Sequence, residues 1–240
     1  MALLEVRGVD VRFGGIHAVR QVDLAVEGGR VSGLIGPNGA GKTTVFDVIT
    51  GLRRPDAGQV VLDGRDISGL AAHRRARLGM ARTFQRLEVF GTLTVRENIL
   101  TSAEVHERGR AAAGAATEAV IDRVGVRAVA GRRADTLPTG LARLVELGRA
   151  LATRPRVLLL DEPASGLDEP ESAALAALLA DLARDGAAVL LVEHDVDLVM
   201  SVCSHVYVLD GGAVLAAGPP VQIQRDPAVL AAYLGTVRAS

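Results

Sequence analysis

The residue best suited to chemistry is Lys42, the only lysine among the chain's 27 lysine and arginine residues. It lies in the run Gly36-Pro37-Asn38-Gly39-Ala40-Gly41-Lys42-Thr43, which matches the pattern GxxxxGK[ST]. In that pattern backbone N–H groups surround phosphate oxygens, and the lysine ammonium reaches the β and γ phosphates. The wider guanidinium of arginine is not interchangeable with a compact ammonium there. The sequence therefore predicts a nucleoside triphosphate site rather than a plain glycine-rich turn.

Two carboxylates, Asp161 and Glu162, follow the aliphatic run 157–160. Such a run is typical of a buried parallel strand, and α/β sheets place ligands at the carboxyl ends of these strands. Asp161 is expected to orient Mg²⁺ together with the hydroxyl of Thr43. Glu162 is expected to accept the proton of an attacking water. The alternative is that the two acids only cap a helix.

His194 follows another apolar run, 187–192. Because the carboxyl ends of parallel strands meet at one edge of a sheet, we expect His194 beside Asp161 and Glu162. From there its imidazole could donate a hydrogen bond to the γ-phosphate. The remaining histidines, which have no such placement, are interpreted as structural: His17, His73, His106 and His205.

Composition limits the class of protein. With 240 residues, the chain is long enough for one large domain or a core with an inserted lobe. The net charge of −1 gives no indication of a nucleic-acid partner. The single cysteine, Cys203, excludes an internal disulfide, fits a reducing compartment and is expected to be buried.

The sequence gives no sign of a membrane span or a secretory signal. The longest apolar runs are far shorter than the ~20 residues that a membrane-spanning helix needs. Residues 1–9 carry Glu5 and Arg7 and are typical of a strand. We therefore expect a chain that is soluble by itself and meets a membrane only through a partner.

Periodicity and turn residues predict an α/β fold. Residues 1–91 and 153–240 should form the nucleotide-binding core, and residues 92–152 an inserted all-helical lobe. The expected strands are 3–13, 21–26, 31–35, 157–160, 187–192, 206–209 and 213–216, with a further hairpin turn at Asp63-Gly64. The expected helices are 43–50, 73–81, 117–124, 141–153 and one near 172–182.

The loop around Lys42, the Asp161-Glu162 pair and His194 follow one another along the chain. In type and order they resemble the motifs of the ATPase subunits of ATP-binding cassette (ABC) transporters, and the resemblance covers essentially the whole chain. The resemblance implies ATP and Mg²⁺ as cofactors. It also implies a P-loop NTPase (RecA-like) core, an antiparallel β subdomain and an inserted helical signature subdomain.

The resemblance assigns further residues. Phe13 stands where the family stacks an aromatic ring on adenine, although a buried core position is the alternative. Gln85 stands at the glutamine that links Mg²⁺ to the transmembrane partner, and Asp168 ends a loop that faces the second ATPase of the dimer. The implied nucleotide-contacting set is Phe13, Gly36, Pro37, Asn38, Gly39, Ala40, Gly41, Lys42, Thr43, Thr44, Gln85, Gly140 and Asp168.

The family's signature, LSGGQ, departs from its pattern here. It falls on residues 137–141, where Pro138 replaces the serine and Leu141 the glutamine. Gly140 and the helix N-terminus remain to face a phosphate. The hydroxyl of Thr139 is expected to compensate in part by capping the helix.

Three segments are similar to the ATPases of branched-chain amino acid importers: 33–36, 81–85 and 226–235. This similarity implies ATP-driven uptake of branched-chain or related amino acids. The implied partners are transmembrane permease subunits contacted by residues 85–90, a second ATPase subunit and, indirectly, a solute-binding protein. A heterodimer is favoured over a homodimer. The implied location is cytoplasmic, peripheral on the inner face of the plasma membrane.

Other functions stay open at this point. The altered signature also suits a nucleotide-dependent regulatory protein with weak hydrolysis. A cassette protein acting on DNA or ribosomes is disfavoured, because such relatives usually carry two cassettes, coiled-coil insertions or basic arms. A P-loop kinase or GTPase would leave Gln85, Gly140, Asp168 and His194 without a shared purpose.

Overall fold

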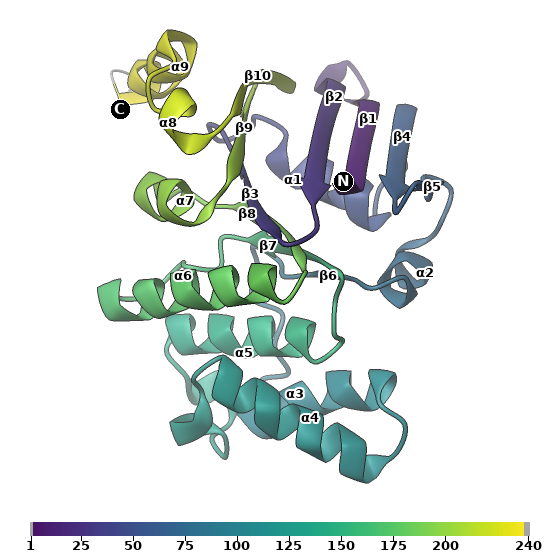
Figure 1. Cartoon of the computed structure of the whole chain (residues 1–240), viewed down its shortest axis with the longest axis vertical. Helices are drawn as coiled ribbons and strands as arrows, with labels where there is room; N and C mark the ends of the chain where they lie inside the picture. Colours follow the sequence, from purple (N-terminus) through teal and green to yellow (C-terminus); the bar gives the residue numbers. More distant parts are fainter. Residues whose placement is uncertain (1, 238–240) are drawn as a thin grey trace.

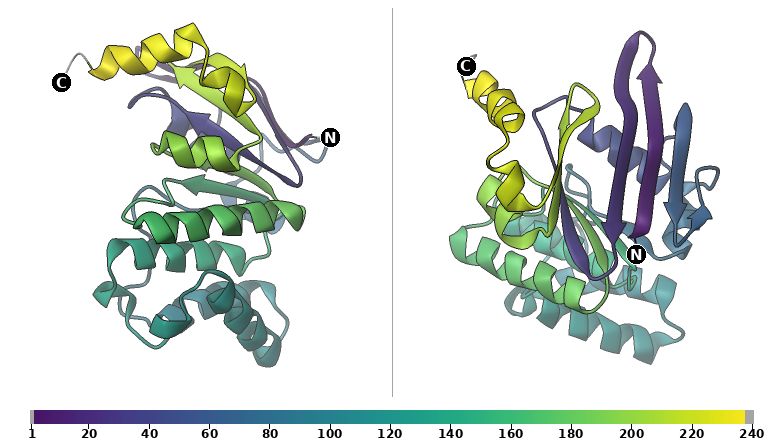
Figure 2. Two further views of the ribbon diagram at one scale, coloured as in Figure 1. Left: turned by 60° about the vertical axis from the view of Figure 1, so that its left-hand side comes forward. Right: turned by 45° about the horizontal axis from the view of Figure 1, so that its top comes forward.

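The structure is a computed structural model that describes residues 2–237, with side chains over residues 2–232. Two sheets and a set of helices build it. Figure 1 shows the amino-terminal sheet beside the central sheet, with the α3, α4 and α5 helices on the side away from it. The two further views in Figure 2 show the same arrangement, with the carboxyl-terminal helix at the far end from α3 and α4.

The amino-terminal sheet is antiparallel, with strand order β2-β1-β4-β5. Its strands are β1 (Ala2–Phe13), β2 (Ile16–Glu27), β4 (Ala57–Leu62) and β5 (Arg65–Asp66). Asp63 and Gly64 join β4 to β5 with φ angles of 52° and 74°, the conformation that Asp-Gly supplies in a tight hairpin. The predicted hairpin at Asp63-Gly64 is confirmed, and β2 begins earlier than predicted, at Ile16.

The central sheet has six strands in the order β10-β9-β3-β8-β7-β6. All pairs are parallel except β9 with β10. The strands are β3 (Arg30–Ile35), β6 (Met80–Arg82), β7 (Val157–Asp161), β8 (Ala188–Val192), β9 (His205–Asp210) and β10 (Ala213–Gly218). A mostly parallel sheet with helices is the predicted α/β class.

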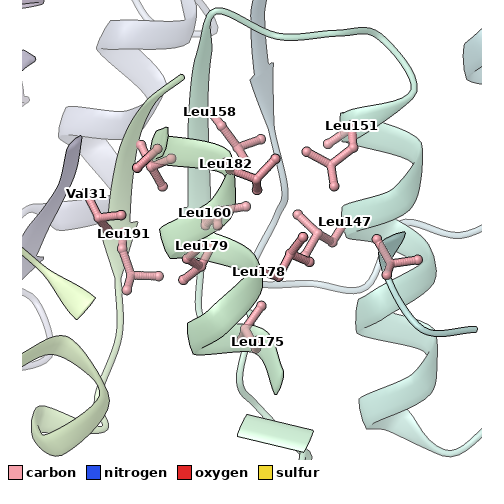
Figure 3. Packing of buried hydrophobic residues seen from close by; sticks show 14 of the residues in the cluster. Val31, Leu147, Leu151, Leu158, Leu160, Leu175, Leu178, Leu179, Leu182 and Leu191 are labelled. Carbon is pink, nitrogen blue, oxygen red and sulfur yellow. The ribbon is translucent and has the colours of Figure 1, made fainter. Parts of the chain in front are cut away.

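The aliphatic run of β7 is continuous because both faces of the sheet are covered. Leu158 and Leu160 point into one hydrophobic cluster, and Val157 and Leu159 point into the other. In Figure 3, Leu158 and Leu160 pack beside Leu175, Leu178, Leu179 and Leu182 of α6, while Leu147 and Leu151 approach from α5. The second cluster joins the central sheet to the amino-terminal sheet through α1.

The helices are α1 (Lys42–Thr50), α2 (Ala72–Arg77), α3 (Val95–His106), α4 (Arg110–Arg123), α5 (Thr139–Leu151), α6 (Glu169–Arg184), α7 (Val196–Val202), α8 (Pro220–Ile223) and α9 (Pro227–Val237). Gly51 closes α1 in the left-handed conformation, as predicted. Thr94 and Glu97 form a reciprocal capping box at the start of α3. None of the helices in the described range combines the length and apolar character needed to span a bilayer.

The predicted helix 73–81 is wrong in its second half. The helix α2 ends at Arg77, and Gly79 reverses the chain with a φ of 90°. Met80, Ala81 and Arg82 then pair in parallel with β7 as an edge strand. The polar, arginine-rich pattern favoured a helix, but pairing with a buried strand decides the conformation of these three residues.

Candidate active site

The phosphate loop connects β3 to α1 and depends on glycine at three positions. Gly36, Gly39 and Gly41 have φ angles of 152°, 80° and 104°. A β-carbon on Gly36 would lie 2.1 Å from the carbonyl oxygen of Leu209, and one on Gly41 would lie 2.6 Å from that of Ala18. The loop therefore needs residues without a side chain both for its conformation and for its close contacts.

Lys42, the first residue of α1, turns back over this loop. Its Nζ donates hydrogen bonds to the carbonyl oxygens of Gly36 at 2.7 Å and Pro37 at 3.0 Å. Burial lowers the pKa of Lys42, and the carboxylates of Glu162 and Asp161 oppose that shift. An ammonium held among carbonyls at a helix N-terminus, with Thr43 next to it, can bind a phosphate anion.

The predicted meeting of β7 and β8 at one edge is observed. Asp161 pairs in register with Val192, so the residues that follow each strand emerge side by side. His194 Nε2 lies 2.9 Å from Glu162 Oε1. Glu162 has a φ of 51°, a left-handed conformation that is uncommon outside glycine. Its backbone N–H donates to the Val192 carbonyl oxygen at 2.9 Å, which holds this turn.

The segment after β6 brings Gln85 into the same site. Gln85 Nε2 donates to Glu162 Oε1 at 3.1 Å, so the amide and the imidazole of His194 converge on one carboxylate oxygen. Three predicted residues from three separate chain segments thus form one hydrogen-bonded group. Asp161 is close by, and burial raises the pKa of its carboxyl group.

Arg82 is a residue of this site that the sequence did not single out for a role. Its side chain is 5% exposed and lies 3.3 Å from Asp161 Oδ2 and 2.5 Å from Asp47 Oδ1 of α1. The guanidinium opposes the rise in the pKa of Asp161. It also connects β6, the helix of the phosphate loop and the end of β7. The motif 81–85 contained this arginine, but no local pattern indicated its two acidic partners.

The signature segment begins α5, with Pro138 as the N-cap residue and Thr139 as the first helical residue. Pro138 and Thr139 are exposed, whereas Gly140 is buried. No side chain caps this helix, so the expectation that the Thr139 hydroxyl would do so is wrong. Proline stands at the cap position, and Thr139 already lies inside the first turn.

Gly140 lies against the loop that precedes α6. A β-carbon on Gly140 would stand 2.5 Å from the carbonyl oxygen of Gly166. Asp168, at the end of that loop, caps α6 in a capping box with Glu171. The two segments that the resemblance places at the dimer surface are therefore packed on each other within one chain.

Phe13, at the end of β1, is 46% exposed, so the alternative that it is a buried core residue is wrong. The Arg53 guanidinium lies over its ring, 4.0 Å from the centroid. The ring is thus held by a cation on one side while much of it stays accessible to solvent, as a stacking platform requires.

Mg²⁺ fits the donors present. Thr43, Gln85 and Asp161 supply a hydroxyl, an amide and a carboxylate, and Mg²⁺ prefers such oxygen ligands. Within the described residues no group of three or more His, Cys, Asp or Glu side chains could hold a metal alone.

A separate cleft lies on another part of the molecule. Its volume is about 940 Å³, and its lining includes Gly28, Arg156 and Ala187. These residues precede β3, β7 and β8, at the amino ends of the strands, whereas the phosphate loop follows the carboxyl end of β3. We place the chemistry at the carboxyl edge because the predicted residues meet there.

The fold and the loop around Lys42 define a P-loop nucleoside triphosphatase. Residues 19–165 match a family described as ABC transporter, and residues 213–239 match one described as branched-chain amino acid ATP-binding cassette transporter. The chain belongs to the ATP-binding cassette transporter family, as its motifs predicted.

Curated relatives agree over almost the full length. The chain is 44% identical to the high-affinity branched-chain amino acid transport ATP-binding protein BraF of Pseudomonas aeruginosa, over 97% of this chain and 98% of the relative. It is 39% identical to LivG of Escherichia coli, a protein of the same description, over the same shares. These relatives support the importer interpretation and not the alternative of a regulatory or non-transport protein.

Solved structures agree with the fold. A nucleotide-free ATP-binding cassette of an ABC transporter superposes with a TM-score of 0.87 at 28% identity, covering 97% of this chain and 99% of that one. An ADP conformation of such a cassette gives a TM-score of 0.85, also at 28% identity, covering 98% of this chain and 99% of that one. The predicted fold class is thereby confirmed, and nucleotide binding follows from the family.

Proposed function

We propose that this chain is the ATP-binding and hydrolysing subunit of an importer for branched-chain or related amino acids. One observation carries the hydrolytic part. Glu162, Gln85 and His194 form a single hydrogen-bonded group at the carboxyl edge of the sheet. Burial lowers the pKa of Lys42 at this edge, and the carboxylates of Glu162 and Asp161 oppose that shift. The 44% identity to BraF supports the choice of solute class.

Each residue of the group has a chemical task. Lys42 and the loop N–H groups bind the β and γ phosphates. Glu162 acts as the general base, and the bonds from His194 and Gln85 to its Oε1 fix the carboxylate in one orientation. Bound Mg²⁺, held by Thr43, Asp161 and Gln85, would neutralise phosphate charge.

Residues 85–90 are the proposed contact with the permease. Phe90 is 48% exposed, and Arg149 of α5 lies 4.4 Å from the centre of its ring. Val89 is partly buried and packs against the hydrophobic cluster that contains Leu158 and Leu160. We propose a core of residues 1–91 and 153–240 and a helical lobe of residues 92–152, with this segment at the boundary where the core meets the lobe. A contact made there with a membrane partner could act on both parts.

The second proposed partner is another ATPase subunit. In this family the signature of one chain completes the nucleotide site of the other. The exposed Pro138 and Thr139 offer a poor signature, since proline has neither a hydroxyl nor a backbone N–H. A partner with an intact signature would complete the site around Lys42 and Glu162. We therefore propose a heterodimer with one fast and one slow site.

Substitution of Lys42 tests the function. Lys42→Ala and Lys42→Arg should both abolish tight binding of fluorescent mant-ATP, because neither side chain restores a compact ammonium inside the loop. Circular dichroism should show an intact fold. Cells carrying the chain with its permeases should take up radiolabelled leucine, and the Lys42→Ala variant should not. Unchanged mant-ATP affinity in either variant would contradict the site, and uptake that persists in Lys42→Ala would contradict the transport role.

A further inference from the structure

Two oppositely charged side chains are buried on one face of α5. Arg143 and Glu146 are 7% and 4% exposed, and Arg143 Nη1 lies 3.0 Å from Glu146 Oε2. Burial raises the pKa of Glu146, while hydrogen bonds and Arg143 oppose that shift. Burying two charges costs free energy unless further hydrogen bonds satisfy them. The partners of those bonds therefore indicate what the pair is for.

The further bonds all go to the backbone that follows β6. Arg143 donates to the carbonyl oxygen of Phe84 at 2.5 Å and to that of Gln85. Glu146 Oε1 accepts from the backbone N–H groups of Phe84 at 3.2 Å and Glu88 at 3.3 Å. The pair thus holds both polar backbone groups of Phe84 and spans the whole segment 84–88.

Arg149 lies one helical turn further along α5. It donates to the carbonyl oxygen of Glu88, so the end of the segment is held as well. Three charged residues at a spacing of three, 143, 146 and 149, therefore attach residues 84–88 to α5.

The chain immediately before this segment is attached to the core instead. Arg82 is paired with Asp47 and Asp161. The hydroxyl of Thr83 accepts from the backbone N–H of Asp161 at 3.1 Å. Thr83 is bonded to the core and the next residue, Phe84, is bonded to α5. No free residue separates the two attachments, so the chain between them can extend very little.

Gln85 is held from both sides at this crossing. Its side chain donates to Glu162 in the core, at 3.1 Å, and its carbonyl oxygen accepts from Arg143 on α5. A displacement of α5 relative to the core would therefore move the backbone of Gln85 relative to Glu162.

We propose that Arg143 and Glu146 are positioning residues that make segment 84–88 move with α5 and thereby set the distance between Gln85 and Glu162. This inference rests on the proposed function, since it takes Glu162 as the general base. The amino end of α5 carries the signature residues Thr139 and Gly140. The same helix therefore connects the surface offered to the partner ATPase with the base of its own site.

The test replaces both charges in the full-length chain. Arg143→Met combined with Glu146→Met keeps side-chain volume and leaves no unpaired buried charge, a change that folded proteins tolerate. Hydrogen exchange at the amides of Phe84 and Glu88 should accelerate at least tenfold, because both lose their acceptor. Mant-ATP affinity should stay unchanged, and kcat for ATP hydrolysis should fall about tenfold, as expected for one lost positioning contact.

Two matched variants accompany it. Glu146→Gln keeps an acceptor oxygen for both amides but no longer pairs with Arg143, so its exchange and kcat should change less than those of the double variant. Arg110→Gln removes an exposed charge from α4 and should change neither. Unchanged exchange in the double variant, or faster exchange with an unchanged kcat, would overturn the proposal. A wild-type chain that binds but does not hydrolyse ATP would instead count against the proposed function. Hydrogen exchange would still decide whether Arg143 and Glu146 hold segment 84–88 on α5.

Discussion

The imidazole of His194 and the carboxylate of Glu162 are joined by a hydrogen bond of 2.9 Å between Nε2 and Oε1. The two residues are 32 positions apart in the chain. They meet because β7 and β8 are parallel neighbours that end at the same edge. Glu162 holds its side chain there from a left-handed backbone conformation. Such a conformation costs of order 1–3 kcal/mol and persists only where surrounding contacts fix it.

Replacing the proposed base should separate binding from hydrolysis. Glu162→Gln keeps the size of the side chain and can still bond to His194, so mant-ATP affinity should stay near wild type. ATP hydrolysis should fall by about 10²–10⁴-fold, because an amide cannot accept the proton. Size-exclusion chromatography with ATP should show a trapped dimer. Turnover near the wild-type rate would place the base elsewhere, with His194 as the next candidate.

Restoring a serine in the signature segment, residues 137–141, should raise the rate of ATP hydrolysis. The purified single chain should hydrolyse ATP slowly, and Pro138→Ser should raise the rate. A hydroxyl–phosphate hydrogen bond is worth about 1.5–3 kcal/mol, or roughly 10- to 150-fold at the affected site. The measurement is steady-state phosphate release.

Serine is also a good N-cap, so capping itself needs a control. Pro138→Asp caps α5 equally well but brings a negative charge toward phosphate, and it should not raise the rate. Brisk hydrolysis by the unmodified chain, with no gain from Pro138→Ser, would refute the asymmetric heterodimer.

Cysteine crosslinking can locate the permease contact. Cysteine at position 88 or 90 should crosslink to the permease in membranes, because Glu88 and Phe90 are exposed beside the crossing from core to α5. Leu215→Cys on β10 is the control, because Leu215 is also exposed. It lies on the edge strand at the opposite end of the central sheet from β6 and should not crosslink. Intact transport without crosslinks from either position would count against this contact.

The native thiol should not interfere with that experiment. Cys203 is buried, and burial raises the pKa of its thiol from 9.0 to about 12. The thiolate fraction at pH 7 is therefore about a thousandfold lower than for an unshifted thiol, and only the thiolate reacts. N-ethylmaleimide should leave the native chain unlabelled and label it once it unfolds in urea. Rapid labelling of the native chain would show that this region opens readily.

The sequence by itself determined the chemistry of the site. The pattern around Lys42 demands a phosphate loop, because glycine and a compact ammonium have few other uses at that spacing. The aliphatic runs before Asp161 and before His194 predicted buried parallel strands. Parallel strands bring their carboxyl ends to one edge, so the meeting of Glu162 and His194 followed from local pattern plus a general rule of sheet geometry.

Only the tertiary structure decided how charged residues pair across the chain. Arg82 finds Asp47 and Asp161, and Arg143 finds backbone carbonyls 58 and 59 positions away. The sequence did not single out either arginine for a role, although Arg143 and Glu146 share the helical face of the apolar residues in α5, which was a usable signal.

The same limit applies to backbone conformation. Met80–Arg82 became a strand because β7 offered it a free edge, and Thr139 does not cap α5 because it stands inside the first turn. Pairing, burial and exact helix starts depend on neighbours distant in sequence. Short-range patterns carry no information about those neighbours, whereas the phosphate loop is specified almost entirely within eight consecutive residues.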